Sequence, residues 1–246
     1  MLWGIVKNLL ERKEIPIEDR TNRPKVVVDR VIARKGKGGL KYLSEFNVYI
    51  PSLRGEELMF AIPSTTYIAY KAKPRKLHNG DCNYWNFVTP KDRYIDEIMT
   101  ELMQTYFDGK ISGNEKEAAQ LVLDFLHQIP YEDRDFLYVK YPIETLCEFG
   151  GNCVDLPVLG ASMLANIGIE TCILGLRDHA LLGIAVPGEG SGVRYKGRLY
   201  QVGETTGTFM PSKPVDDRIG ETEEDLSTLE IIDSKYGRKI IKEPDH

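Results

Sequence analysis

Residues 141–170 read YPIETLCEFGGNCVDLPVLGASMLANIGIE, and this stretch decides the fold. In its second half, apolar residues recur every three or four positions with small residues between them, a spacing that predicts one buried helix rather than a strand. These residues are Leu156, Leu159, Met163 and Ile167. Gly168 is the predicted end of the helix, because glycine readily adopts the left-handed conformation that closes one.

The start of this helix is predicted from three residues. Pro157 must lie in or near the first turn, because a proline deeper in a helix clashes with the carbonyl four residues before it. Asn152 and Asp155 are three positions apart and resemble a capping box. Cys153 is therefore expected at the helix N-terminus, where unpaired N–H groups and the positive dipole end stabilise a thiolate. A nucleophile is the first hypothesis, although a free cysteine is also a common core residue.

The overall composition indicates a globular intracellular protein. The chain has 246 residues, of which 42% are hydrophobic, and its net charge of -5 gives no reason to expect nucleic-acid binding. Its four cysteines form no CxxC pair, so free thiols in a reducing compartment are expected. The N-terminus has no signal-peptide cleavage site and is too short to span a bilayer. We therefore predict a soluble, cytoplasmic protein, with a membrane-surface helix at the N-terminus as the alternative.

The first third of the chain predicts a short arm or helix followed by strands. The arm covers residues 1–22, and the strands are predicted at 25–33, 46–50 and 58–62. The glycine-rich loop at 34–39 lacks the Gly-Lys-Ser/Thr ending of a phosphate loop, so we interpret it as a solvated turn. Residues 64–76 mix tyrosines with basic residues. Stacking on nucleic-acid bases is one interpretation, but a strand or helix edge leading into a linker is favoured.

Helices and then strands are predicted in the remainder. Apolar stripes predict helices at 91–107 and from Asn114 to before Pro130. Strands are predicted at 169–176, 179–186 and 193–203, the last with a hairpin turn at Lys196 and Gly197. Residues 221–246 are polar and are expected to form a loosely attached tail with one final strand.

A cysteine nucleophile needs a base within hydrogen-bond reach and a third group that orients the base. His179 opens one predicted strand, and Glu204 closes the following hairpin. If these strands are adjacent in an antiparallel sheet, and the Cys153 helix packs on that sheet, the three side chains meet at one sheet edge. His127, next to Gln128, is interpreted as a surface residue or a helix C-cap.

This order of cysteine on a helix, histidine on a strand and acid on a strand resembles the transglutaminase-like superfamily, whose fold is related to that of papain. The closest resemblance is to its archaeal and bacterial cysteine-protease group, which carries P-x-E-T-L, G-D-C-E-D, G-H-x-x-V-G-V and E-T-T segments. The corresponding segments are PIETL at 142–146, GNCVD at 151–155, DHALLGI at 178–184 and ETT at 204–206, and residues 84–102 and 125–135 are also similar. The similarity therefore covers most of residues 45–220.

The resemblance implies an α+β fold: a papain-like, transglutaminase-like core in which the nucleophile helix packs on an antiparallel sheet. It implies that Cys153 is the nucleophile, His179 the general base and acid, and Glu204 the orienting carboxylate in place of the more usual aspartate. The expected parts of the chain are the arm at 1–22, a small β extension at 23–76, the catalytic core at 77–220 and the tail at 221–246. Asn152 and Val154 depart from the group, which commonly has acidic residues there, and the loss of two negative charges favours a thiolate.

The predicted function is a thiol-dependent hydrolase that cleaves amide bonds of a peptide or protein substrate through a thioester, without metal or cofactor. The oxyanion hole is expected to include the backbone N–H of Cys153, with Gln128 and Tyr131 as candidates for the second donor. Amine transfer by a transglutaminase and a non-catalytic binding module are the alternatives.

Two other uses of the cysteines are disfavoured. Cys147 is the rival nucleophile, but we find no helix-start signal in its segment and expect a packing role for it. A structural metal site would draw on Cys147, Cys153, Cys172 and His179. Such sites usually bring paired ligands two to four residues apart, and this sequence has no such pair.

Overall fold

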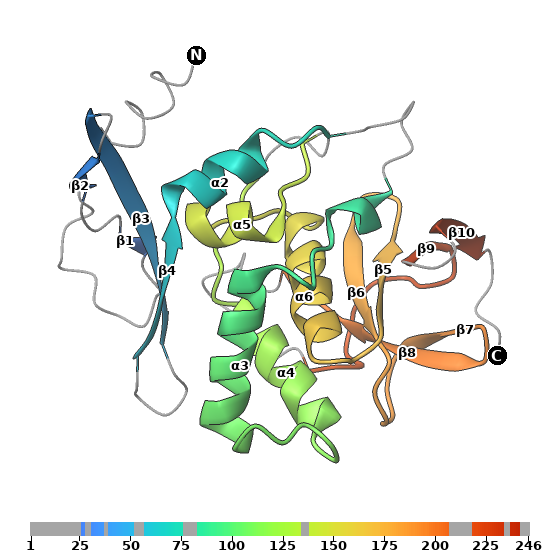
Figure 1. Ribbon diagram of the computed structural model, residues 1–246. Coiled ribbons are helices and arrows are strands. Elements are labelled where there is room, and N and C mark those ends of the chain that lie inside the picture. The colour runs from blue at the N-terminus through green and yellow to red at the C-terminus, as the bar shows by residue number, and fades with distance from the viewer. Residues whose placement is uncertain are drawn as a thin grey trace.

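A layer of helices lies between two antiparallel sheets in this computed structural model (Figure 1). The structure describes residues 26–27, 31–36, 39–51, 57–75, 83–133, 138–206, 218–233 and 237–241. The mixed α+β class is as predicted, and the arm predicted at 1–22 lies outside the described residues.

The first sheet is built on β3 (Gly39–Pro51), which pairs with β1 (Val26–Val27), β2 (Val31–Gly36) and β4 (Glu57–Pro63). The strands predicted at 46–50 and 58–62 are confirmed, because they lie within β3 and β4. The strand predicted at 25–33 is divided into β1 and β2. The solvated turn predicted at 34–39 is wrong in its extent, since β2 continues to Gly36 and β3 begins at Gly39.

Two short helices cover this sheet and differ from the predictions. Residues 64–76, predicted as a strand or helix edge, contain α2 (Ser64–Lys71). The helix α5 (Pro142–Glu148) was not predicted, and it contains Cys147. The prediction that Cys147 lacks helix-start signals is wrong, because Pro142 occupies the first helical position and Glu144 completes a capping box.

The remaining helices follow their predicted apolar stripes. The helix predicted at 91–107 is α3 (Arg93–Phe107), and Asp92 caps it by accepting a hydrogen bond of 2.9 Å from the backbone N–H of Tyr94. The next is α4 (Glu115–Leu126). The helix behind Cys153 is α6 (Asp155–Asn166), and it ends before Gly168, whose φ is 84°. A short 3-10 helix, η1 (Tyr84–Phe87), precedes α3.

The second sheet carries the predicted site. Its strands lie in the order β10, β9, β5, β6, β8, β7. Their bounds are Gly237–Ile241, Leu229–Asp233, Thr171–Gly175, Ala180–Ile184, Arg198–Gly203 and Gly192–Tyr195, respectively. The three strand predictions are confirmed, as is the hairpin turn, where Lys196 and Gly197 have φ of 51° and 78°. One face of this sheet packs on α6, and the other encloses a second apolar cluster.

Helix α6 packs very closely on its neighbours. A Cβ at Gly160 would lie 2.8 Å from side-chain atoms of both Leu126 in α4 and Leu182 in β6. The absence of a side chain at this position therefore lets α6 lie between α4 and the sheet. This packing fixes the helix of Cys153 against the strand that follows His179.

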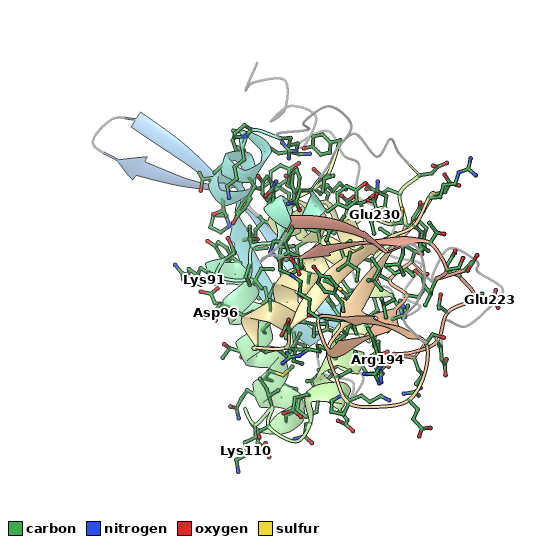
Figure 2. The ribbon with its side chains drawn as sticks, turned by 90° about the vertical axis from the view of Figure 1, so that its right-hand side faces the viewer. Lys91, Asp96, Lys110, Arg194, Glu223 and Glu230 are labelled. Carbon is green, nitrogen blue, oxygen red and sulfur yellow. The ribbon has the colours of Figure 1, made fainter. Side chains whose placement is uncertain are left out.

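The predicted tail needs correction. Residues 229–233 form β9, which pairs with β5, and Ile231 is fully buried between neighbouring strands. Residues from 221 onward therefore do not form a loosely attached tail with one final strand, because β9 and β10 complete the main sheet. Elsewhere, charged side chains such as Lys110, Arg194 and Glu223 project from the outer surface (Figure 2). Within the described ranges, no helix is long and apolar enough to cross a bilayer.

Candidate active site

Cys153 lies at the start of α6, in a turn fixed by a capping box. The Asn152 Oδ1 atom accepts hydrogen bonds from the backbone N–H groups of Val154 (3.0 Å) and Asp155 (3.1 Å). In return, Asp155 Oδ2 accepts one of 3.1 Å from the backbone N–H of Asn152. The first helical bond joins Leu156 N–H to the carbonyl of Asn152. Cys153 therefore lies in the capped turn that leads into α6, two residues before Asp155, the first residue of the helix.

His179 and Glu204 lie at the same edge of the second sheet because their strands are antiparallel neighbours. Leu182 in β6 faces Gly203 in β8, so the residue just before β6 and the residue just after β8 are close. Their side chains are mostly buried, with 18% of His179 and 13% of Glu204 exposed. His179 and Glu204 therefore lie at one sheet edge, as expected if their strands are adjacent and antiparallel.

The three side chains interact in the order Glu204, His179, Cys153. His179 Nε2 lies 2.9 Å from Glu204 Oε2, and the Cys153 side chain acts on the His179 ring and raises its pKa. Glu204 is held on its other oxygen, where Oε1 accepts hydrogen bonds from Thr206 N–H (2.8 Å) and Thr206 Oγ1 (2.6 Å).

This arrangement favours a charged imidazole ring. Burial lowers the pKa of His179, but the hydrogen bonds and charges of Cys153 and Glu204 outweigh it and raise the pKa to about 10. Burial likewise opposes ionisation of Glu204, yet His179 and Thr206 hold its pKa below the ordinary value. Both shifts support a His179 imidazolium paired with a Glu204 carboxylate.

The two candidate oxyanion donors differ in their surroundings. The Gln128 amide is turned back onto α4, where Nε2 donates a hydrogen bond of 3.2 Å to the carbonyl of Asp124. Tyr131 forms a hydrogen bond with the Cys153 side chain, and its pKa is raised by burial and then by the charge of Cys153. The backbone of Tyr131 also bridges to Gly151, two residues before the cysteine. Tyr131 is thus the candidate that contacts the sulfur.

The loop before Cys153 is held by a buried lysine. Lys140 is 2% exposed, and its Nζ donates a hydrogen bond of 2.8 Å to the carbonyl of Gly150. The same ammonium pairs with Glu132 at 2.6 Å and with Glu148 at 2.8 Å. Its backbone N–H donates to Asp155 Oδ1 at 2.8 Å. Lys140 therefore holds Asp155 through its backbone N–H and the loop before Cys153 through its ammonium group.

The other described cysteines lie in apolar surroundings. Burial, and then the charges of Glu148 and Glu144, raises the pKa of Cys147 well above its ordinary value. Burial similarly raises the pKa of Cys172. A thiol of this kind is a poor nucleophile at neutral pH. Among the residues that the structure describes, no three His, Cys, Asp or Glu side chains gather as they would around a metal ion.

His127 is a site residue that the sequence interpretation missed. It follows α4 as the predicted C-cap, but it is only 6% exposed and is therefore not a surface residue. Its Nε2 lies 2.7 Å from the main-chain oxygen of Glu204. The sequence signal was weak, because nothing near His127 in the chain points to a partner 77 positions away.

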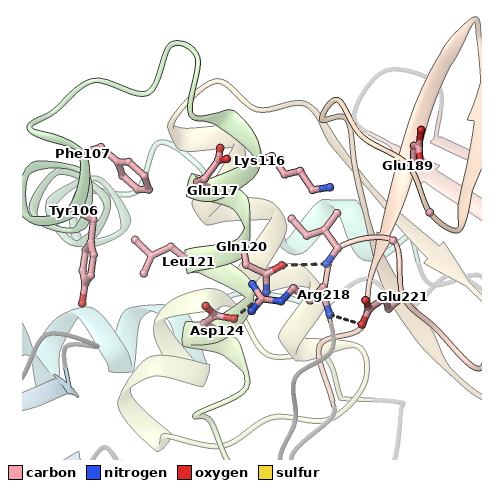
Figure 3. A pocket seen from close by; sticks show the side chains of 13 residues that line it. Tyr106, Phe107, Lys116, Glu117, Gln120, Leu121, Asp124, Glu189, Arg218 and Glu221 are labelled. Carbon is pink, nitrogen blue, oxygen red and sulfur yellow. Dashed lines mark hydrogen bonds between the residues drawn. The ribbon is translucent and has the colours of Figure 1, made fainter.

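A separate cavity of about 690 Å³ lies beside α4 (Figure 3). Four carboxylates and two cations line it together with apolar side chains; they are Glu117, Asp124, Glu189 and Glu221, and Lys116 and Arg218. Its wall is closed by a hydrogen bond of 3.0 Å from Ile219 N–H to Gln120 Oε1. The residues that line this cavity do not include Cys153, His179 or Glu204. The cavity and the candidate active site are therefore different places on the protein.

Comparisons with known proteins identify no relative. No protein-family profile, curated protein sequence or solved structure matches this chain. The geometry of the site and the residues in it are therefore the basis of the functional argument.

Proposed function

We propose that this protein is a thiol-dependent hydrolase that cleaves amide bonds in peptides or isopeptides through Cys153, His179 and Glu204. The observation that carries the proposal is the pairing of His179 Nε2 with Glu204 Oε2 at 2.9 Å, beside a Cys153 side chain that raises the pKa of His179. A nucleophile, a base bonded to it and a carboxylate that orients the base make up the minimal set for covalent acyl transfer. The transglutaminase-like, papain-related arrangement inferred from the sequence is part of the same proposal.

Cys153 is well placed for activation. It lies in the turn just before α6, so its residue is close to the positive end of the helix dipole. The raised pKa of His179 favours an imidazolium, which stabilises an adjacent thiolate.

In the proposed reaction, the thiolate attacks the carbonyl carbon of the amide to form a tetrahedral oxyanion. Collapse of this intermediate breaks the C–N bond, and the His179 imidazolium gives its proton to the leaving amine. The remaining thioester is attacked by water, whose proton passes to His179, and the acid product leaves as the thiolate is restored. Glu204 keeps the ring oriented through Nε2 in every step.

The oxyanion would be stabilised by the backbone N–H of Cys153 and by the Tyr131 hydroxyl. In this structure the Tyr131 hydroxyl is hydrogen-bonded to the Cys153 side chain. In the proposed mechanism this hydroxyl turns to the substrate oxygen when substrate binds. Removing one such donor typically lowers kcat by roughly 100- to 1000-fold. Tyr131→Phe should therefore lower kcat by this order and change KM much less.

The proposal is tested first without a known substrate, by alkylation with iodoacetamide at pH 7 and mass-spectrometric quantification of each cysteine. Cys153 should react faster than an ordinary exposed thiol, and His179→Ala should abolish this advantage. Cys172 is a matched internal control, because it is buried and lies away from the triad. Hydrolysis of a peptide library should then be lost in Cys153→Ala and retained in Cys172→Ala. Ordinary reactivity at Cys153 together with unchanged hydrolysis in Cys153→Ala would end the proposal.

Hydrolysis and amine transfer share the thioester and differ in what attacks it. We favour water, and a direct comparison decides: the protein is incubated with a glutamine-containing peptide and a labelled primary amine. The expected result is release of acid or ammonia without incorporation of label. Incorporation that depends on Cys153 would replace the hydrolase with a transglutaminase.

A further inference from the structure

The main-chain carbonyl of Glu204 is held by a histidine from outside the sheet. His127 Nε2 lies 2.7 Å from that oxygen, and the His127 side chain is almost fully buried. We propose that His127 is a positioning residue that fixes Glu204, and through it the orientation of His179. The inference rests on the proposed function, because it assigns His127 a role in the same site.

Glu204 needs such a partner because it lies just beyond the end of its strand. The pairing of β8 with β6 ends at Gly203, so the sheet no longer fixes the backbone at Glu204. A shift of the Glu204 backbone would move the carboxylate that orients His179. The hydrogen bond from His127 replaces the missing strand partner at the residue where alignment matters most.

All three oxygen atoms of Glu204 have a donor. Oε1 accepts from Thr206, Oε2 is bonded to His179, and the carbonyl is bonded to His127. A carbonyl oxygen can only accept a hydrogen bond, so His127 Nε2 must carry a proton. The side chain and the main chain of Glu204 are thus held by different partners, and His127 is the partner of the main-chain oxygen.

His127 is mounted on a rigid support that also contacts the nucleophile helix. It directly follows α4, whose Leu123 and Leu126 are fully buried. Leu126 packs against Gly160 in α6, and a Cβ at Gly203 in β8 would lie 3.6 Å from Leu123. Helix α4 therefore touches both the helix of Cys153 and the strand of Glu204, so the His127 bond fixes the spacing between the two catalytic elements.

The test compares three substitutions at position 127 by the rate and pH dependence of Cys153 alkylation. His127→Phe keeps a ring but removes the donor. His127→Gln keeps an N–H donor at similar reach, and His127→Asn keeps a donor that is too short to reach the Glu204 oxygen. Misplacement of a catalytic group by about 1 Å can cost on the order of 100-fold. We expect His127→Phe and His127→Asn to slow alkylation at pH 7 at least about 10-fold, and His127→Gln to stay within about threefold of the wild type.

A merely structural role would not give this pattern, because Gln and Asn are similar in polarity and differ only in reach. If His127→Phe does not fold, the alkylation rates of His127→Gln and His127→Asn still test whether reach to the Glu204 oxygen matters. Equal rates of Cys153 alkylation in His127→Gln and His127→Asn, with a large loss of rate in His179→Ala, would overturn the inference and leave the proposed function intact. An unchanged rate in His179→Ala would overturn both, so the two failures are distinguishable.

Discussion

Replacing the buried Lys140 with methionine should lower the free energy of unfolding by about 3 kcal/mol at pH 7. The substitution keeps an unbranched side chain that ends where the lysine Cε lies, and it removes an ammonium group that is 2% exposed and interacts with Glu132, Glu148 and the Gly150 carbonyl. Burial opposes ionisation of Glu148, but Lys140, with smaller contributions from Lys71 and Tyr67, lowers its pKa from 4.5 to about 2. That shift corresponds to roughly 3 kcal/mol, of which Lys140 supplies the largest share.

Loss of the donor to the buried Gly150 carbonyl adds about 1 kcal/mol, so Lys140→Met should lower the free energy of unfolding by about 3 kcal/mol at pH 7. The pKa of Glu148 is depressed in the folded state, so its contribution is present above pH 4.5 and is lost as the pH falls toward 2.

Urea unfolding at pH 7 and pH 3 measures both effects. The matched control is Arg93→Met, which removes the cation of an exposed ion pair with Glu97 and should leave the free energy of unfolding nearly unchanged. A loss below about 1 kcal/mol for Lys140→Met at pH 7, or an equal loss at both pH values, would contradict the stabilising role of Lys140.

Two further substitutions test the packing and the charge around Cys153. Gly160→Ala should lower the free energy of unfolding by about 1–2 kcal/mol in urea melts, although alanine usually favours a helix, because the new Cβ would lie 2.8 Å from Leu126 and Leu182. Combination with Leu182→Val, which removes a contacting methyl group, should cost less than the sum of the single losses, whereas strict additivity would contradict this steric cause. Asn152→Asp should slow Cys153 alkylation at pH 7 about 10-fold, because a buried carboxylate beside Asp155 and the sulfur disfavours a thiolate. An unchanged or faster rate would show that the neutral side chain at this position has no electrostatic role.

Local signals allowed the helix of Cys153 to be predicted from the sequence. The capping residues Asn152 and Asp155 are neighbours in the chain, and Pro157 restricts the start to one turn. The meeting of His179 and Glu204 was also predictable, because two antiparallel strands that are neighbours in a sheet place the start of one beside the end of the other. The α5 helix was missed although Pro142 and Glu144 give comparable local signals.

Contacts between distant segments could not be predicted in this way. β9 is a five-residue strand that pairs with β5 across more than fifty intervening residues, and its polar surroundings in the sequence mimic a tail. The bond from His127 to Glu204 depends on how α4 packs against β8, which no spacing in the sequence records. Tyr131 was a candidate because of its place upstream of Cys153, but its contact with the sulfur is a product of the tertiary fold.

The central claim is that the His179 ring lies between the Cys153 sulfur and the Glu204 carboxylate. NMR titration of the His179 ring, assigned by comparison with His179→Asn, tests it most directly. We expect a pKa near 10 in the wild type and a value lower by at least about one unit in Cys153→Ala, where the interaction with the sulfur is lost. A His179 pKa near the ordinary 6.5 in both proteins would contradict it.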